Sequence, residues 1–276
     1  MITVPRPIAL PCSLPYRIDI ASPPPDALDL LIQLGALDVD PIPGGLAAIL
    51  PDAVTADTVA HTFGFESVTI SPAVSHDDQS VWLLSPRSLR IGRTLIVPPE
   101  IDAPPGALRL IDSTAFGTGH HPTTALCIEA LEAILAGNPI PSILDVGTGS
   151  GILALIALNM GVPRAVGLDV DAAALEAAAE NARLNHLAHR LQLVHGAAGS
   201  VTGCWPLVVA NVLAAPLIEM APLLAQRVAS RGQLLLSGIP LSVESQVRRA
   251  YEHLGMKHVD STQRDGWVML DVRASW

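Results

Sequence analysis

The chain from Pro122 onward alternates short apolar runs with amphipathic segments, and this order restricts its fold more than any other feature. Such runs are typical of parallel strands joined by crossover helices, because these strands are buried on both faces. The expected strands are 142–146, 165–169, 191–195, 207–211 and 233–237, and the expected helices are 124–135, 151–160, 171–185, 215–229 and 241–254. A hairpin over 258–262 and 267–273, turning at Asp265-Gly266, is expected to close the chain. The sequence therefore predicts an α/β fold with a doubly wound Rossmann-like sheet over residues 112–276.

The first 80 residues differ in texture from the rest because they are rich in proline. Their pattern predicts strands at 16–21, 46–50 and 67–70, with helices at 25–34 and 55–62 between them. Strands and helices in this order indicate a small α+β domain over residues 1–80. Residues 81–111 hold apolar pieces separated by prolines, and we expect them to form a linker between the two domains.

The charges argue against nucleic acid as a partner. The formal net charge is −10, and the sequence has one lysine, Lys257, and no run of Lys or Arg. We therefore expect no direct nucleic-acid binding. An acidic surface instead favours a basic protein partner, because opposite charges steer the encounter.

The apolar residues are expected to build a soluble core, with no membrane span. The most apolar stretch, 207–226, is interrupted by two prolines, an asparagine and a glutamate, whereas a bilayer helix needs about 20 nearly uncharged residues. The three cysteines are too few and too scattered for a disulfide framework or a zinc site; they are Cys12, Cys127 and Cys204. We expect reduced thiols, no metal, no secretory signal and a cytoplasmic location.

A glycine-rich segment, Asp145-Val-Gly147-Thr-Gly149-Ser-Gly151, ends one expected strand and opens the next helix. Glycines at alternate positions let the backbone turn tightly and approach a ligand without interference from a Cβ atom. The amide groups at the start of the following helix are free to bind polar ligand atoms. The segment therefore predicts a nucleotide-like ligand at the carboxyl end of this strand.

The spacing of this segment favours S-adenosylmethionine over a dinucleotide. The dinucleotide fingerprint is G-x-G-x-x-G, whereas here the third glycine comes one residue early and Asp145 precedes the first. A carboxylate at this place repels a pyrophosphate and attracts the methionyl ammonium of S-adenosylmethionine, partly through water. Asp145, Gly147, Gly149 and Gly151 are therefore predicted cofactor-binding residues.

Asp169 is the second predicted contact with this ligand. It follows Gly147 by 22 residues and ends the next strand, where a carboxylate can accept both ribose hydroxyls. The alternative is that Asp169 only caps the following helix. Asp171 is better placed for capping, so ribose binding is the favoured role.

Two further segments give the chain a family resemblance. Ala115-Phe-Gly-Thr-Gly-His-His-Pro-Thr-Thr124 is close to an A-F-G-T-G-x-H-P-T-T signature, and Val208-Val-Ala-Asn211-Val-Leu-Ala214 looks like V-A-N-I-L-A. Together with the glycine-rich segment, they make residues 80–276 resemble the ribosomal protein L-eleven methyltransferase family. His120 departs from the family's usual Thr, and residues 195–199 lack the Asp common near the adenine.

The resemblance implies a function and a set of site residues. In that family the residues matching Thr124, Gly147, Asp169 and Asn211 contact S-adenosylmethionine. Members methylate the α-amine and lysine ε-amines of ribosomal protein L-eleven. The resemblance also implies that the small N-terminal domain is ferredoxin-like and recognises this substrate.

Asn211, Phe116 and His121 are the candidate catalytic residues. Asn211 ends a strand at the carboxyl edge of the sheet, where its amide oxygen could orient the methionyl group or the incoming amine, although it could also only cap a helix. The segment from Phe116 to His121 contains Gly117 and Gly119 and could form a lid over the cofactor, or an ordinary tight turn. The adjacent His120 and His121 lack a third ligand at suitable spacing, so no metal site is expected.

Three other functions stay open from the sequence. The first is a methyltransferase that acts on another protein or on a small molecule. The second is a non-catalytic cofactor-binding module associated with the ribosome, and the third is a nicotinamide-dependent oxidoreductase. The intact glycine-rich segment argues against the second, and its spacing argues against the third.

Overall fold

The computed structural model describes residues 14–64, 67–76, 81–85, 87–111, 113, 115–137 and 139–276. The chain divides into two compact units, residues 1–86 and residues 87–276. Cys12 lies outside the described residues, whereas Cys127 is buried and Cys204 is exposed.

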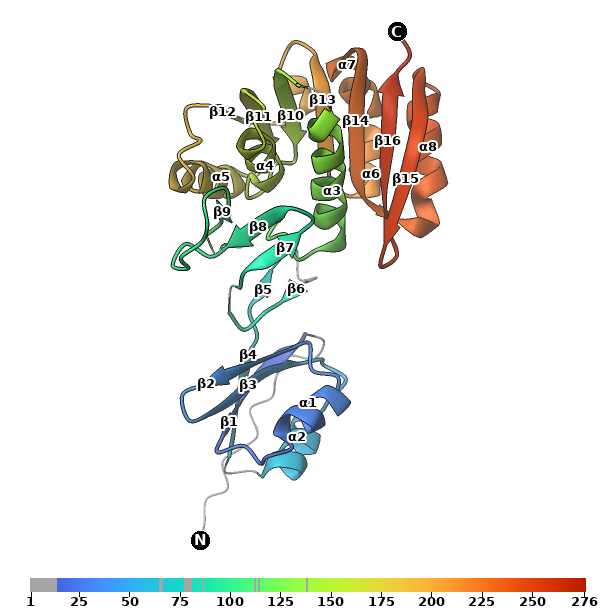
Figure 1. Ribbon diagram of the computed structural model, residues 1–276. Helices are drawn as coiled ribbons and strands as arrows, with labels where there is room; N and C mark the ends of the chain where they lie inside the picture. The colour runs from blue at the N-terminus through green and yellow to red at the C-terminus, as the bar shows by residue number, and fades with distance from the viewer. Residues whose placement is uncertain are drawn as a thin grey trace. The chain divides into compact units, whose positions relative to one another are not determined.

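The smaller unit has the ferredoxin-like order βαββαβ. Its elements are β1 (Tyr16–Ala21), α1 (Ala27–Gln33), β2 (Asp38–Ile42), β3 (Gly45–Leu50), α2 (Ala56–Phe63) and β4 (Val68–Pro72), followed by the short pair β5 (Ser75–His76) and β6 (Val81–Trp82). The four long strands form an antiparallel sheet in the order β2-β3-β1-β4 (Figure 1). This topology is the α+β architecture expected from the sequence.

Alternation along β1 explains how this sheet acquires a core. Tyr16, Ile18 and Ile20 are buried, and they pack in one cluster with Leu31 of α1 and Val59 of α2. Successive side chains of a strand point to opposite faces, so this spacing places all three under the helices. The sequence pattern therefore located β1, α1 and α2 correctly.

Strand β2 was missed because its sequence, Asp-Val-Asp-Pro-Ile, lacks an apolar alternation and contains a proline. The strand lies at an edge of the sheet, where a residue without an N–H group is tolerated. Asp38 is buried there, and its Oδ2 accepts a hydrogen bond of 2.8 Å from the Leu84 backbone N–H. A tertiary contact thus satisfies a carboxylate that the sequence pattern would leave in solvent.

The larger unit is built on a seven-stranded sheet in the order β12-β11-β10-β13-β14-β16-β15 (Figure 1). Its strands are β10 (Ser142–Val146), β11 (Arg164–Asp169), β12 (Leu191–His195), β13 (Trp205–Asn211), β14 (Val228–Pro240), β15 (Met256–Arg264) and β16 (Trp267–Ala274). The first five strands in this order are parallel, and the β15–β16 hairpin joins β14 antiparallel. The doubly wound sheet and the closing hairpin were both predicted correctly.

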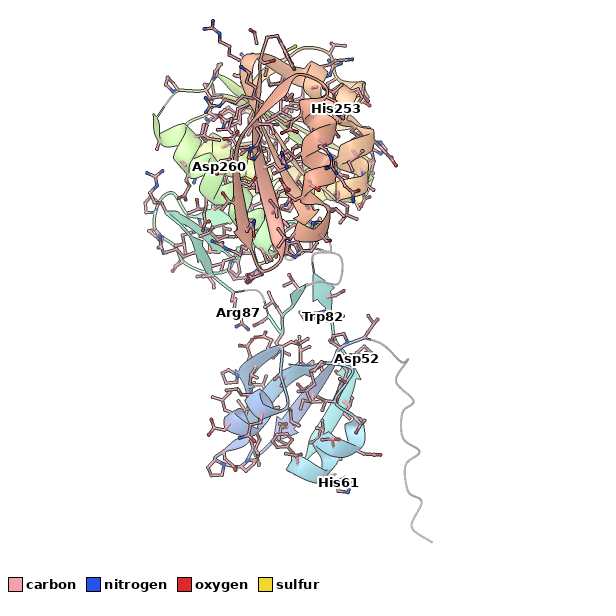
Figure 2. All side chains as sticks on the ribbon, turned by 90° about the vertical axis from the view of Figure 1, so that its right-hand side faces the viewer. Asp52, His61, Trp82, Arg87, His253 and Asp260 are labelled. Atoms are coloured by element: carbon pink, nitrogen blue, oxygen red, sulfur yellow. The ribbon has the colours of Figure 1, made fainter. Side chains whose placement is uncertain are left out.

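Helices cover both faces of this sheet. They are α3 (Pro122–Gly137), α4 (Ile152–Asn159), α5 (Ala172–Leu184), α6 (Ala214–Glu219), α7 (Ala221–Arg227) and α8 (Glu244–Glu252). One core cluster joins the sheet to α3 and α4, and a second joins it to α6, α7 and α8. Figure 2 views the sheet from its β15 edge, with Asp260 on β15 and His253 beyond the end of α8. Among the residues that the structure describes, no helix has the length and apolarity of a membrane-spanning segment.

Two expected helices have different bounds in the structure. The segment 215–229 is divided at Met220 into α6 and α7, and β14 already begins at Val228. Pro222 is the second residue of α7 and lies in its first turn, where the missing N–H group costs nothing. Residues 241–243 form a 3₁₀ turn before α8. Apolar periodicity alone cannot show these breaks.

Residues 87–111 are part of the larger unit, although the sequence suggested a linker over 81–111. They form a small sheet of β7 (Leu89–Ile91), β8 (Thr94–Val97) and β9 (Leu108–Arg109). Asn185 holds β9 by accepting from the Arg109 N–H (2.8 Å) and donating to the Arg109 carbonyl (2.6 Å). Asn181 Oδ1 likewise accepts from the Ile111 N–H at 2.8 Å. These side chains lie 70 and 76 residues away along the chain, so local sequence could not reveal the pairing.

Glu132 of α3 anchors the β7–β8 turn to the large unit. Its carboxylate is buried and accepts hydrogen bonds from the Arg93 N–H (3.0 Å), the Thr94 N–H (2.8 Å) and the Thr94 hydroxyl (2.7 Å). Burial by itself would raise the pKa of Glu132, but these bonds outweigh it and leave the pKa below its ordinary value. The turn is therefore bound by an ionised side chain.

Replacing Glu132 with alanine is expected to lower the free energy of unfolding by about 2–3 kcal/mol, because the Arg93 and Thr94 N–H groups lose their charged acceptor. The melting temperature of the full chain should fall by roughly 5–10 °C. The pKa of Glu132 is lower in the folded protein than its ordinary value. The ionised Glu132 therefore stabilises the fold at pH values above the ordinary pKa, and this stabilisation is lost as pH falls through the lower folded-state pKa.

The matched control for this exchange is Glu129→Ala on the same helix. Glu129 pairs with Arg264 at 2.9 Å, but both side chains are more than a third exposed, so its loss should cost less than about 1 kcal/mol. Equal melting temperatures for the two variants would contradict the anchoring role of Glu132.

Candidate functional site

The glycine-rich loop lies between β10 and α4, at the carboxyl edge of the sheet. Gly147, Gly149 and Gly151 all have positive φ angles, of 72°, 53° and 82°. A Cβ atom would lie 2.3 Å from Val212 Cγ1 at Gly147, and 2.4 Å from the Phe116 carbonyl oxygen at Gly149. Larger residues therefore conflict with the loop in both backbone conformation and space.

Asp169 fixes this loop from the neighbouring strand β11. Its Oδ2 accepts a hydrogen bond of 2.9 Å from the Gly149 N–H, and its Oδ1 accepts one of 3.0 Å from the Asp171 N–H. The N-cap of α5 is Asp171, whose side chain accepts from the Ala173 N–H at 2.9 Å. Asp169 therefore does not cap α5 itself, and its carboxylate keeps further lone pairs for hydroxyl donors. The adjacent Val170 exposes 70% of its surface.

Asp145 lies inside the sheet, beneath the loop. It is fully buried, and its Oδ2 accepts from the Thr148 hydroxyl at 2.8 Å and from the Ala154 N–H at 3.2 Å. Its Oδ1 is buried without a hydrogen-bond partner among the described residues. Burial raises the pKa of Asp145 to about 6, the bonds from Thr148 and Ala154 lower it, and the charge of Asp169 raises it. A nearby cation would favour the ionised form.

Asn211 and Thr124 meet at the same edge, although they are 87 residues apart. The Asn211 side-chain N–H donates to Thr124 Oγ1 at 3.3 Å, and both residues are buried. Asn211 Oδ1 is buried without a partner among the described residues. Ser237, which pairs with Asn211 from the neighbouring strand β14, donates to the Thr123 carbonyl at 3.1 Å. The start of α3 is thereby tied to the carboxyl ends of β13 and β14.

The segment 115–121 packs directly on the glycine-rich loop. The Ser150 N–H donates to the Phe116 carbonyl (2.9 Å), and the Ser150 hydroxyl donates to the Gly117 carbonyl (2.7 Å). Asn181 Nδ2 donates to the Ser150 carbonyl at 2.9 Å. The segment therefore covers the loop in this structure. Ser150 and Asn181 were not among the predicted site residues, because their role depends on contacts between distant segments.

His121 connects this segment to α3. Its ring is buried, and Nδ1 accepts from the Thr123 N–H at 3.3 Å and hydrogen-bonds with the Thr123 hydroxyl at 2.7 Å. Its centroid lies 5.6 Å from that of Phe116 and 5.0 Å from that of Trp267. His120 instead contacts Thr118. Within the described part of the chain, no three His, Cys, Asp or Glu side chains are grouped as metal ligands.

Two of the buried oxygens that have no hydrogen-bond partner among the described residues, Asp145 Oδ1 and Asn211 Oδ1, test which ligand fits. Asp145 is the next-to-last residue of β10 and Asn211 is the last of β13, and these strands are neighbours in the sheet. Buried acceptors without donors are costly, and an ammonium or amine N–H would satisfy them. A pyrophosphate offers only negative charge at this place. The chemistry of the edge thus fits S-adenosylmethionine, with Asp169 and the glycine-rich loop placed for its nucleoside.

Comparison with known proteins decides the family. Residues 55–275 match the family described as ribosomal protein L11 methyltransferase (PrmA). The chain belongs to this family. Among the relatives of the L11 methyltransferase family, the protein of Pelobacter propionicus is 39% identical over 212 residues, which cover 74% of this chain and 69% of the relative. That of Azotobacter vinelandii is 44% identical over 200 residues, covering 71% and 67%.

A solved structure supports the same assignment. The ribosomal protein L11 methylase of Lactobacillus delbrueckii subsp. bulgaricus is 30% identical, with a TM-score of 0.63, and the match covers 68% of this chain and 99% of that one. Membership of the L11 methyltransferase family identifies the chain as an S-adenosylmethionine-dependent methyltransferase. The nicotinamide-dependent and non-catalytic alternatives are thereby set aside.

Proposed function

We propose that this protein methylates lysine and N-terminal amines of ribosomal protein L11 in the cytoplasm, using S-adenosylmethionine. The observation that carries the proposal is Asn211 Oδ1, which is buried at the carboxyl edge of the sheet and has no hydrogen-bond partner in the described part of the chain. This oxygen suits the N–H of an incoming amine. The net charge of −10 also suits a basic protein substrate.

The cofactor-binding residues in this proposal come from four elements of the large unit. Asp169 accepts the ribose hydroxyls, and Gly147, Gly149 and Gly151 let the backbone approach the nucleoside. Asp145 attracts the methionyl ammonium from beneath the loop. Thr124 holds Asn211 through the 3.3 Å hydrogen bond and thereby sets the direction of the Asn211 side-chain oxygen.

Methyl transfer from S-adenosylmethionine requires correct positioning of the amine and the methyl group, and it needs no covalent intermediate with the enzyme. Bound S-adenosylmethionine supplies a methyl group already activated on a sulfonium, which an amine lone pair can displace directly. Asn211 accepts one N–H and aims that lone pair, and Phe116 and His121 shape the pocket and exclude water. The substrate ammonium must first lose a proton to solvent, and burial beside a cation lowers its pKa from about 10.4. We assign no residue as a general base.

The proposal is tested by intact-mass analysis of purified L11 after incubation with the enzyme and S-adenosylmethionine. L11 should gain mass in whole methyl units, and peptide mapping should place them on amines. Reactions with S-adenosylhomocysteine instead should give no gain. Unchanged L11, with label from the cofactor appearing only in small metabolites of a cell extract, would contradict the proposal.

Cofactor affinity is expected to depend on pH through Asp145. Its pKa of about 6 in the free protein means that lowering the pH from 7 to 5 protonates it and removes the charge that attracts the ammonium. Because binding favours the ionised form, affinity should be about tenfold weaker at pH 5 than at pH 7. Calorimetric titration at both values measures this difference.

Asp145→Asn supplies the control for the pH experiment. Its affinity should be lower at pH 7 and should change little between pH 5 and 7, because the titrating group is gone. A variant that keeps the wild-type pH dependence would show that another group is responsible.

A further inference from the structure

Three aromatic rings from two distant parts of the chain gather at the carboxyl edge. Phe116 precedes α3, His121 immediately precedes its first residue, and Trp267 is the first residue of β16. Trp267 meets His121 edge to face at 5.0 Å, and Phe116 lies tilted against the same ring at 5.6 Å. His121 is buried between them, whereas Phe116 and Trp267 are half-buried. Only three Phe and four Trp occur in the whole sequence, so this gathering is not a by-product of abundant aromatics.

Backbone connections place Trp267 at the part of the carboxyl edge where the substrate amine would bind. Trp267 pairs with Pro240 in the ladder between β16 and β14. The Leu241 N–H donates to the Gly266 carbonyl at 2.9 Å, which fixes the hairpin tip against the end of β14. Ser237, on the same strand β14, is bonded to Thr123, next to His121 and Thr124. Trp267 therefore belongs to the same end of the sheet as Asn211, and three strands separate it from β11, the strand of Asp169.

Trp267 has an apolar neighbour on one side and a neutralised charge on the other. Leu241, beside the hairpin tip, exposes 50% of its surface. On the neighbouring strand β15, Trp267 pairs with Arg264, which forms a 2.9 Å ion pair with Glu129. A half-buried indole attracts a weakly hydrated cation through the negative face of its ring. An ammonium gains this property as its N–H groups are replaced by methyl groups. Asn211 Oδ1 has the opposite preference, because it needs an N–H to accept.

We propose that Trp267 forms the wall of the acceptor pocket, binds the methylated ammonium of the substrate through its ring face, and thereby sets how many methyl groups each amine receives. The inference rests on the proposed function. In each round the amine nitrogen forms a bond to the methyl carbon while the carbon–sulfur bond breaks. The bonding pair stays on sulfur, and the nitrogen loses one proton to solvent. Trp267 acts between rounds by retaining an amine that offers Asn211 fewer N–H groups.

The test compares Trp267→Leu with Trp267→Phe. Intact-mass analysis measures how many methyl groups each L11 molecule carries, in samples in which the same fraction of L11 has received a first methyl group. Trp267→Leu keeps apolar volume and removes the ring, so the fraction of amines with more than one methyl group should fall about fivefold. Trp267→Phe should restore most of that fraction. Trp205→Leu is the matched control, because Trp205 begins β13 at the opposite end of the sheet, and its product distribution should equal that of the wild type.

A binding measurement separates this role from a structural one. L11 methylated beforehand by the wild type is titrated into each variant with S-adenosylhomocysteine present. Trp267→Leu should lose about fivefold in affinity for methylated L11 and much less for unmethylated L11. Melting temperature and S-adenosylmethionine affinity, measured alongside, show whether the variant is folded; a purely bracing role would change these two and leave the product ratio intact.

The outcomes distinguish the inference from the function on which it rests. Wild-type enzyme that adds no methyl group to L11 overturns both. The second outcome is that the wild type adds several methyl groups to L11 and Trp267→Leu gives the same product distribution and the same preference for methylated L11. This outcome overturns only the role of Trp267. If Trp267→Leu does not fold, the test uses Trp267→Phe alone. This variant keeps an aromatic ring, so a fivefold loss of multiple methylation in it would also overturn the role of the ring.

Discussion

Gly149→Ala is expected to weaken S-adenosylmethionine binding by at least about 100-fold, equivalent to ~3 kcal/mol. The added Cβ would lie 2.4 Å from the Phe116 carbonyl oxygen, which is backbone and cannot turn aside. Relieving this overlap separates the segment 115–121 from the glycine-rich loop and breaks the Ser150–Phe116 hydrogen bond. It also displaces the Gly149 N–H, which donates a hydrogen bond to Asp169. Calorimetric titration of the purified variant measures the loss.

Gly161→Ala serves as the control for Gly149→Ala. Gly161 also has a positive φ, of 105°, but among the described residues no atom outside its chain neighbours lies within 4 Å of the position of an added Cβ. This exchange should therefore lower stability through backbone strain while leaving cofactor affinity within about twofold. Equal losses of affinity in both variants would mean that strain, and not the contact with Phe116, controls the loop.

Asn211→Ala is expected to reduce kcat/KM for L11 by roughly 100- to 1000-fold, the scale seen when a group that orients the reacting atoms is removed. Its Oδ1 is buried without a partner among the described residues, and its amide is held by Thr124. Alanine keeps the fold of the strand end and removes the acceptor for the amine N–H. Initial rates with varied L11 at saturating cofactor measure the change.

Asn211→Asp tests whether the oxygen itself matters. The Thr124 hydroxyl can turn to donate to the new carboxylate, so an acceptor still faces the amine. This variant should retain more activity than Asn211→Ala, although the buried charge costs stability. If alanine were as active as aspartate, Asn211 would have only a packing role.

The local part of the site could be predicted from the sequence because its determinants are close together along the chain. The glycine-rich segment follows a short apolar strand, and Asp169 ends the next one at a fixed spacing. Parallel strands bring such ends to one edge of the sheet. The structure accordingly brings Asp145, Gly149 and Asp169 to the same edge of the sheet, where Asp169 accepts a hydrogen bond from the Gly149 N–H.

The other part depends on contacts between distant segments, which a single sequence does not encode visibly. Trp267 belongs to none of the motifs in the sequence, yet its ring contacts that of His121, nearly 150 positions away along the chain. The small sheet over 87–111 similarly depends on Asn181, Asn185 and Glu132. Periodicity could not show that Asp145 would be fully buried, or that the helix expected over 215–229 would break at Met220. Tertiary packing decides these features.

A ligand-shift melting experiment tests the central claim most directly, namely that the carboxyl edge of β10, β11 and β13 binds S-adenosylmethionine. Stabilisation by a ligand reflects its affinity for the folded state alone. The account predicts that S-adenosylmethionine and S-adenosylhomocysteine raise the melting temperature of the full chain in a saturable manner, while NAD leaves it unchanged. A rise with NAD and none with S-adenosylmethionine would contradict it.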